Sequence, residues 1–311
     1  MYPPPQPEQA RYQAKLLVNM VVLVFLIIGL LLVLQYFNFI YLRDIPVIGN
    51  WLMDTYERVF GVPQVLILHG DDSLGDWTAL QLALTNKMIF YSEDIDVRKF
   101  TAGLGAKLNQ YDLVIVEDAL TIDKDKLVNL DSYVKGGGNL IWVGDAGTRG
   151  EVHYEGEVIA NQTGWFRGIV CVDSVTMKQC NCTLNKTASC KFLPESADGG
   201  AAQMQEDFTG ILGMTFIKDI VGAGATMEIV DNDHWAATGI KYNFPLNVTK
   251  ITAVSNSMAT ALVANINISN KVYPGLVVND PPGSWGNIVF FAYPPEATPE
   301  ILLPLVQRLR Y

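Results

Sequence analysis

Residues 112–145, DLVIVEDALTIDKDKLVNLDSYVKGGGNLIWVGD, form the stretch that decides the fold. Two continuous apolar runs, in Asp112–Asp118 and Asn139–Asp145, have the length and the β-branched content of buried strands. Apolar residues between Leu127 and Val134 recur at helical spacing, and three consecutive glycines then end the helix. A strand, a helix and a second strand in this order predict two parallel strands joined by a helix that packs on them.

The same alternation continues on both sides of this stretch. Further strands are predicted over Val65–His69, Met88–Ser92, Thr226–Val230, Thr260–Ile266, Gly275–Val278 and Asn287–Tyr293. Further helices are predicted over Asp76–Leu84, Val97–Leu108 and Pro299 to about Leu309. Strands and helices that alternate with short connections predict an α/β fold with a doubly wound, mostly parallel sheet of the flavodoxin-like kind.

Residues 150–225 interrupt this rhythm and are predicted to form an insertion in the domain. They contain every cysteine of the chain: Cys171, Cys180, Cys182 and Cys190. Two disulfides would close short loops here and stabilise the insertion by restricting the unfolded chain. A bond across one intervening residue is strained, so two pairings stay open: 171–180 with 182–190, or 171–182 with 180–190. A zinc site is the alternative, although these spacings match no known zinc knuckle.

The N-terminal part contains a long apolar stretch, residues 16–42, without any charged residue. As a helix it would span roughly 40 Å, more than the ~30 Å hydrocarbon core of a bilayer. We therefore expect a single membrane-spanning helix, with its core at Val18–Tyr36 and an aromatic belt at its end: Tyr36, Phe37, Phe39 and Tyr41. A cleaved secretory signal is the alternative, but its apolar region is normally only about 7–15 residues long.

Glycosylation sequons and cysteines lie together downstream of this stretch, which favours export of the C-terminal part. The acceptor asparagines are Asn161, Asn181, Asn185, Asn247 and Asn267. The expected organisation is a cytoplasmic tail over 1–15, the membrane helix over 16–42, a connector over 43–62 and an exported domain over 63–311. The expected location is the cell membrane of an archaeal cell surface, with a eukaryotic type II membrane protein as the alternative.

Composition and charge limit the partners. The formal net charge of −10 argues against nucleic acid, and 13 Phe, 13 Tyr and 6 Trp exclude disorder for most of the chain. The expected partners are the lipid bilayer, other membrane or cell-surface protein subunits, and glycans. No cofactor is expected, because the glycine triplet precedes a strand and no phosphate-binding loop or G-x-S-x-G motif is present.

Polar side chains follow several of the predicted strands at their carboxyl ends. These rim residues are His69, Asp71, Asp72, Asp118 and Asp145. The carboxyl ends of parallel strands meet at one edge of a sheet, where doubly wound folds bind ligands, so a divalent cation or a polar sugar is one expectation. The alternative is helix capping, with Asp72 or Ser73 before the helix at 76–84. His234 is expected to stabilise a turn, and His153 to lie on the surface.

The stretches YDLVIVEDAL and LVNLDSYVKGGGNLIWVGD resemble the core of the class I glutamine amidotransferase-like superfamily, closest to its trehalose-utilisation-type, non-amidotransferase branches. DNDHWAATGI and GNIVFFAYPPEATPEILLPLVQRL resemble the closing segment of those domains. The resemblance covers roughly residues 62–150 and 226–311. It implies an amidotransferase-like fold, in which catalytic members carry a cysteine at a sharp strand-to-helix turn.

The corresponding turn is WVGDAGT, Trp142–Thr148, here called the elbow segment. It contains neither cysteine nor serine, so the nucleophile that the resemblance implies is missing. We therefore expect no catalytic residues, no bound metal and no amidotransferase activity, and predict a non-catalytic, membrane-anchored accessory or structural subunit that contacts other proteins. The alternatives are a carbohydrate- or metal-binding surface module and a metal-dependent hydrolase that uses the acidic rim residues.

Overall fold

The chain divides into two compact units, residues 1–62 with Tyr311 and residues 63–310. The computed structural model describes residues 7–36, 64–71, 73–87, 91–99, 103–154, 157–163, 165, 169–173, 190–194, 212–237, 243–256, 260–280 and 286–309.

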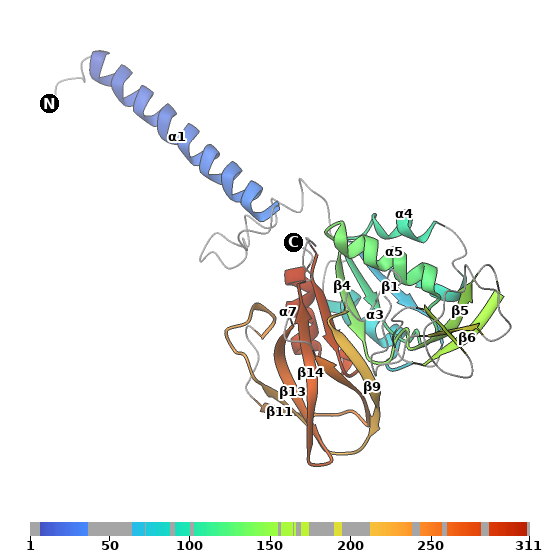
Figure 1. Ribbon diagram of the computed structural model, residues 1–311. Helices are drawn as coiled ribbons and strands as arrows, with labels where there is room; N and C mark the ends of the chain where they lie inside the picture. Colours follow the sequence, from blue (N-terminus) through green and yellow to red (C-terminus); the bar gives the residue numbers. More distant parts are fainter. Residues whose placement is uncertain are drawn as a thin grey trace. The chain divides into compact units, whose positions relative to one another are not determined.

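Five parallel strands form one half of a nine-stranded sheet in the second unit (Figure 1). In sheet order they are β2 (Tyr91–Asp96), β1 (Gln64–His69), β3 (Leu113–Val116), β4 (Asn139–Val143) and β15 (Ile288–Phe291). All residues of β3, β4 and β15 are buried, as expected for parallel strands that helices cover on both faces. This half confirms the predicted α/β architecture.

The strand predicted at Met88–Ser92 is displaced, because β2 begins at Tyr91 and ends at Asp96. Residues 88–90 lie outside the described ranges. β2 is the edge strand of the sheet, and an edge strand is free to carry charged residues such as Glu93 and Asp94. The prediction followed an apolar run, which indicates a central strand better than an edge strand.

Four antiparallel strands extend the sheet beyond β15. In order they are β14 (Lys271–Asn279), β13 (Ala261–Ile268), β10 (Ala225–Ile229) and β11 (Asn243–Leu246). The prediction of a mostly parallel sheet is therefore wrong for this half, and the sheet is mixed. Ser269 and Asn270, with φ of 53° and 59°, form a two-residue connection between β13 and β14. A parallel crossover needs about a dozen residues, so this connection permits only a hairpin.

A separate two-stranded sheet accompanies this half. It consists of β9 (Met214–Val221) and β12 (Lys250–Asn256), which pair antiparallel. Neither strand was predicted, although β12 contributes the buried residues Ile251 and Thr252. The backbone N–H of Thr252 donates to the carbonyl of Ala292, 2.8 Å away, which attaches this sheet to the end of β15.

Helices cover the parallel half on opposite faces. They are α3 (Trp77–Lys87), α4 (Leu104–Leu108), α5 (Lys124–Lys135) and α7 (Pro299–Leu309), with 3-10 turns η2 (Val97–Lys99), η3 (Trp235–Ala237) and η4 (Pro295–Ala297). α3 connects β1 to β2, which lies on one side of β1 in the sheet. α5 connects β3 to β4 in the opposite direction along the sheet. Because such crossovers are right-handed, α3 and α5 lie on opposite faces. The helix predicted over Val97–Leu108 is interrupted, with Gly103 at φ 81° before α4.

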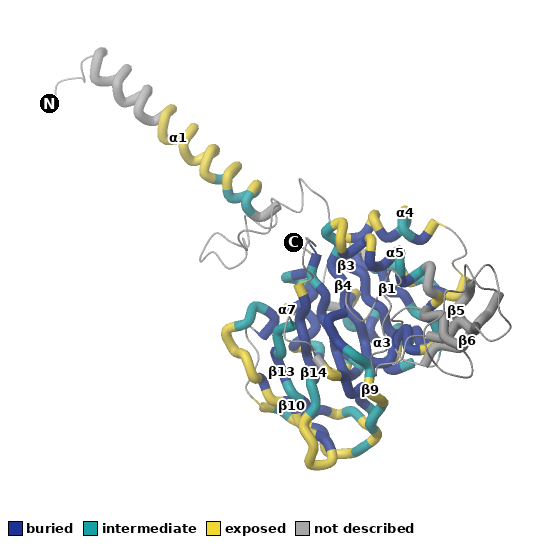
Figure 2. Tube along the Cα trace, in the orientation of Figure 1, coloured by how far each residue is buried: buried dark blue, intermediate teal, exposed yellow. Residues whose placement is uncertain are grey.

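The core lies between these layers. Its largest fully buried side chains include Trp142, Phe290, Phe291 and Tyr293, all on or directly after β4 and β15. Figure 2 shows the buried residues concentrated in the parallel strands, while the outer hairpins are more exposed. The Tyr293 hydroxyl lies 2.9 Å from the Thr298 hydroxyl, so this buried polar atom has a partner.

The described part of the N-terminal unit is the helix α1 (Pro7–Tyr36). Its apolar side chains between Val18 and Val33 are largely exposed. Within the described ranges, no helix has the length together with the apolar character needed to cross a membrane. This finding corrects the predicted membrane-spanning helix over 16–42, of which α1 includes only the part up to Tyr36. Residues 37–42 and the connector over 43–62 lie outside the described residues.

In the described part of the insertion, β5 (Arg149–Tyr154) pairs antiparallel with β6 (Glu157–Thr163), and β7 (Ile169–Asp173) pairs antiparallel with β8 (Cys190–Pro194). Cys171 is paired with Phe192, and Cys190 with Asp173. No disulfide is present among the described residues, so the disulfide prediction is corrected. The register does not place these two cysteines opposite each other, and Cys180 and Cys182 lie outside the described residues.

Candidate functional site

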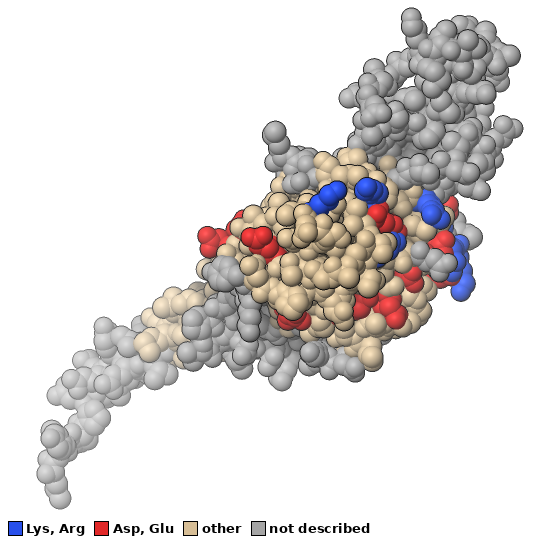
Figure 3. Space-filling view, turned by 90° about the horizontal axis from the view of Figure 1, so that it is seen from below, with Lys and Arg blue, Asp and Glu red and all other residues tan. Residues whose placement is uncertain are grey.

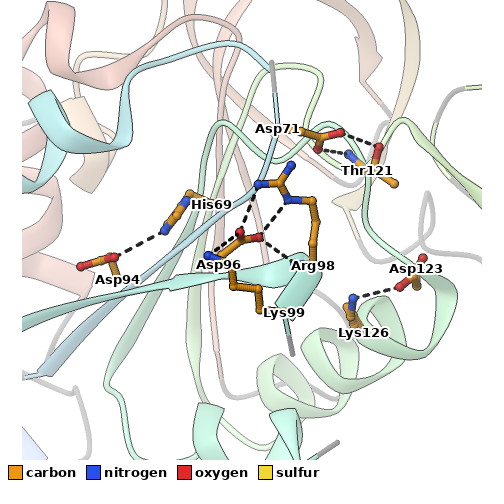
Figure 4. A network of polar contacts seen from close by, with 9 residues as sticks. All are labelled: His69, Asp71, Asp94, Asp96, Arg98, Lys99, Thr121, Asp123 and Lys126. Carbon is orange, nitrogen blue, oxygen red and sulfur yellow. Dashed lines mark hydrogen bonds and ion pairs between the residues drawn. The ribbon is translucent and has the colours of Figure 1, made fainter. Parts of the chain in front are cut away.

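The candidate site is the edge of the sheet where β1, β3 and β4 end. His69 is the last residue of β1, and its Nε2 lies 3.4 Å from Oδ2 of Asp94 on β2 (Figure 4). Its ring stacks on Trp77 of α3, with 4.1 Å between ring centroids and 11° between planes. His69 is therefore held between the edge strand and the first turn of α3.

Asp71 binds the backbone segment that follows β3. Its Oδ1 accepts the Thr121 N–H at 3.1 Å and its Oδ2 accepts the Thr121 hydroxyl at 3.0 Å (Figure 4). Asp72, its neighbour, lies outside the described residues. Asp71 thus lies at the predicted edge, where its hydrogen bonds connect the loop after β1 to the loop after β3.

We expect Asp71→Ala to lower the free energy of unfolding by about 1–2 kcal/mol, because it removes both hydrogen bonds to Thr121. Thr121→Val is the matched control, since it removes only the hydroxyl bond and should cost about half as much. Urea unfolding followed by tryptophan fluorescence measures both. Unchanged stability in Asp71→Ala would contradict the structural role and leave the carboxylate available for a ligand.

Asp118 and Asp145 hold the segment Ser73–Asp76, here called the cover segment. Asp118 Oδ1 accepts the Ser73 N–H at 3.1 Å, and Asp145 Oδ1 accepts the Ser73 hydroxyl at 2.7 Å and the Leu74 N–H at 2.9 Å. Asp118 adopts φ 49°, an uncommon conformation for a residue other than glycine. Both rim carboxylates therefore face the protein's own backbone.

Lys250 of β12 neutralises Asp145 from the other side. Its Nζ lies 2.9 Å from Asp145 Oδ2 and 3.0 Å from Asp219 Oδ2. Burial acts to raise the pKa of Asp145, but the hydrogen bonds from Lys250 and Ser73 outweigh it and lower that pKa. Burial and the charge of Asp145 raise the pKa of Asp219. Lys250 is desolvated as well, yet its two carboxylate partners raise its pKa, so it stays protonated.

A leucine side chain occupies the space beside the elbow segment. Gly144 directly follows β4 and has φ 54°. A Cβ at this position would lie 2.6 Å from Leu74 Cδ2 and 2.8 Å from Leu74 Cβ, well inside normal contact distance. The buried Leu74 side chain therefore occupies the space into which a side chain at the elbow would project. Thr148 is also buried, and its hydroxyl donates to the Asp145 carbonyl at 2.7 Å.

Two carboxyl groups that the sequence analysis did not single out meet beneath the cover segment. Glu117 follows β3 and is fully buried, and Glu296 lies in η4. Glu296 Oε1 accepts the Asp76 N–H at 3.0 Å. Both oxygens of Glu117 and Oε2 of Glu296 are buried without a hydrogen-bond donor. Burial and then Glu296 raise the pKa of Glu117 well above its usual value, and burial raises that of Glu296.

Helix capping at this edge is performed by Asp76, a different residue from the Asp72 or Ser73 that was predicted. Asp76 Oδ1 accepts the N–H groups of Thr78 at 3.0 Å and Ala79 at 3.2 Å, the pattern of an N-cap at the start of α3. The Thr78 hydroxyl also donates to Asp76, and this bond lowers the pKa of the Asp76 carboxyl. No group of three or more potential ligands suited to a metal ion is present in the described part of the chain.

Two further ion pairs lie near the edge. Arg98 donates to both oxygens of Asp96 at 3.0 Å, and Lys126 pairs with Asp123 at 2.9 Å (Figure 4). The hydrogen bond from Arg98 holds the pKa of Asp96 well below its usual range. Figure 3 shows acidic and basic side chains intermingled at the margins of one face of the domain.

The other residues predicted from the sequence are two histidines and five glycosylation asparagines. His234 stabilises a turn, because its Nδ1 accepts the Ala236 N–H at 3.2 Å. Burial lowers the pKa of His234. Asn247 and Asn267 are exposed, and Asn161 lies on β6. His153 lies on β5, and Asn181 and Asn185 lie outside the described residues. Glycosylation stays a prediction at all five asparagines.

No family model matches the sequence, and no curated protein matches it either. Solved structures do show a similar fold. The chain superposes on a cold-adapted β-galactosidase from Rahnella sp. R3 with a TM-score of 0.51 and 14% identity, covering 84% of this chain and 33% of the galactosidase. It thus spans about a third of that protein. At this identity the likeness concerns the fold alone.

Two further structures show weaker likeness. A ThuA-like protein from Bacteroides uniformis matches with a TM-score of 0.47 and 9% identity, over 80% of this chain and 92% of that one. A carbohydrate deacetylase matches with a TM-score of 0.45 and 10% identity, over 79% of this chain and 32% of that one.

Sequence reasoning missed Glu117, Glu296, Lys250 and Asp219. Glu117 carried one signal, since it directly follows the buried run LVIV and strand neighbours of such runs are commonly buried. Its partner lies in another part of the chain, after β15. Nothing in the local pattern of PPEATPE distinguishes Glu296 from an exposed loop glutamate.

Proposed function

We propose that the second unit is a non-catalytic accessory domain of the amidotransferase-like kind, which acts by binding other proteins. The observation that carries this proposal is the contact between Leu74 and Gly144. The elbow position has no side chain of its own, and a buried leucine fills the space beside it. Acyl transfer at this turn would need a nucleophilic side chain and free space around it. The turn has neither.

The rim residues support the same proposal. Asp71, Asp118 and Asp145 each accept hydrogen bonds from the protein's own backbone, and Lys250 neutralises Asp145. Carboxylates engaged in this way stabilise a loop and are poorly placed to activate a water molecule. The fold similarity supports it further, since a comparable fold makes up one third of a larger chain in the galactosidase.

The test is the composition of the protein's native assembly. The full chain, carrying an affinity tag, is isolated from its own cells under gentle conditions and its mass is measured by native mass spectrometry. We expect stoichiometric companion chains that Asp71→Ala leaves bound, because that carboxylate has an internal role. A chain that is recovered alone, as a monomer or homo-oligomer, would overturn the accessory role.

A polar ligand such as a sugar is a second candidate, favoured by one observation. His69 and Trp77 stack at the edge of α3 beside Asp94, whose carboxylate is 39% exposed and also accepts from Gln81 at 3.3 Å. An aromatic face beside an exposed carboxylate is a suitable surface for a sugar ring. Titration of the chain with neutral oligosaccharides, followed by tryptophan fluorescence, tests this, with Asp94→Asn expected to weaken binding. Unchanged fluorescence at saturating sugar would exclude it.

A further inference from the structure

The carboxyl groups of Glu117 and Glu296 form a buried pair that the proposed accessory role does not use. If both carboxyl groups were ionised, three of their oxygen atoms would be buried without a hydrogen-bond donor, and two negative charges would lie next to each other. Such an arrangement is costly, since an unpaired buried charge loses its hydration without compensation. A single proton shared by the pair avoids this cost. The protonated carboxyl of Glu117 then donates to the carboxylate of Glu296, which already accepts the Asp76 N–H.

The titratable groups around Glu117 all favour this protonated state. They come from three places in the chain: Asp76 before α3, Asp118 next to Glu117 itself, and Glu296 in η4. Each is acidic, and each disfavours a further negative charge on Glu117. Burial acts in the same direction and has the largest effect on the pKa of Glu117. The pair therefore keeps a proton at pH values where an exposed glutamate, with a pKa of about 4.3, has lost it.

The cover segment lies directly on this pair. Gly75 has φ 115°, and a Cβ at this position would overlap Oε1 of Glu117. The next backbone N–H, that of Asp76, is bound to Glu296. Backbone and carboxyl are thus in contact without an intervening side chain. An ionised Glu117 can regain hydration only if water enters between them, which requires the cover segment to move.

We propose that Ser73–Asp76 is a pH-sensitive cover over the carboxyl edge of the sheet, closed while the Glu117–Glu296 pair holds its proton and released when that proton is lost. This inference is independent of the accessory role. The direction follows from linkage. The open state binds no proton above about pH 5 while the closed state binds one, so the closed state weakens as pH rises, by up to tenfold per pH unit until the pair ionises.

Amide hydrogen exchange in the full chain tests the proposal. Protection of peptides covering residues 73–80 is measured from pH 5 upward, with each rate divided by the intrinsic rate at that pH. We expect wild-type protection to fall by up to tenfold per pH unit. Glu117→Gln keeps the shape of the protonated side chain and donates an N–H to Glu296, so its protection should stay constant over the same range.

Glu300→Gln is the matched control, because Glu300 is an exposed glutamate in the first turn of α7 and should behave like the wild type. Infrared spectroscopy of the wild type adds a readout that does not depend on any variant. The C=O band of a protonated carboxyl should persist above pH 5 while protection falls, and disappear at the pH where protection stops falling. Protection that does not change with pH, or that changes equally in Glu117→Gln, would overturn the proposal, as would the absence of this band above pH 5.

Discussion

Gly144→Ala is expected to lower the free energy of unfolding by about 3 kcal/mol. Two costs add up at this position. The residue has φ 54°, where a Cβ costs about 1–2 kcal/mol, and the added Cβ would lie 2.6 Å from Leu74 Cδ2 inside a packed region. Overpacking of this kind typically costs a further 1–3 kcal/mol or so. Urea unfolding of the full chain, followed by tryptophan fluorescence, measures the loss.

Two comparisons isolate the contribution of Leu74. Gly103→Ala has a similar backbone conformation, φ 81°, but a Cβ there would meet nothing within 4 Å, so only the conformational cost of about 1 kcal/mol applies. Gly144→Ala introduced into a Leu74→Ala background should also cost only about 1 kcal/mol. If Gly144→Ala is no more destabilising than Gly103→Ala, the elbow has free space and the argument for its closure fails.

Lys250→Met is expected to cost about 3 kcal/mol of unfolding free energy. It removes the cation between Asp145 and Asp219 and leaves the side chain of Asp145, only 4% exposed, as an unpaired buried charge. Breaking a buried pair costs about 3–5 kcal/mol, and the low end applies because Lys250 is itself 33% exposed. Methionine keeps the length of the stem, so the loss reports on charge and hydrogen bonding. Thermal and urea unfolding measure it.

Lys135→Met is the matched control, since Lys135 pairs with Asp131 at 2.7 Å but its side chain is 62% exposed. The expected loss there is below about 0.5 kcal/mol. Adding Asp145→Asn to Lys250→Met removes the unpaired charge and should recover part of the stability. Equal losses in Lys250→Met and Lys135→Met would show that the pair with Asp145 contributes no more than a surface ion pair.

The parallel half of the sheet could be predicted because each of its central strands is a short apolar run bounded by glycines or polar residues. LVIV and NLIWV need no partner to be recognised, since burial on both faces requires apolar residues at every position. The antiparallel half was harder. The apolar runs of β13 and β14 predict strands, but the direction of these strands depends on the two-residue connection at Ser269-Asn270, which is too short for a parallel crossover.

The candidate site, too, could be predicted only in part. That His69, Asp71, Asp118 and Asp145 would gather at one edge followed from strand polarity alone. What each carboxylate contacts did not follow, because the partners come from distant parts of the chain: Asp145 meets Ser73 and Lys250, separated from it by 72 and 105 positions. In the structure Asp71, Asp118 and Asp145 bind the protein's own backbone, and a cation or sugar at this edge stays a prediction.

The sequence by itself determined the α/β class and the absence of cysteine and serine from Trp142–Thr148, because these depend on residue type and on short-range periodicity. Only the tertiary structure decided that Leu74 closes the elbow, that Lys250 neutralises Asp145, and that Glu117 meets Glu296. Electrostatic and packing energies depend on distances between side chains, and the folded chain sets those distances across connections that no local pattern describes.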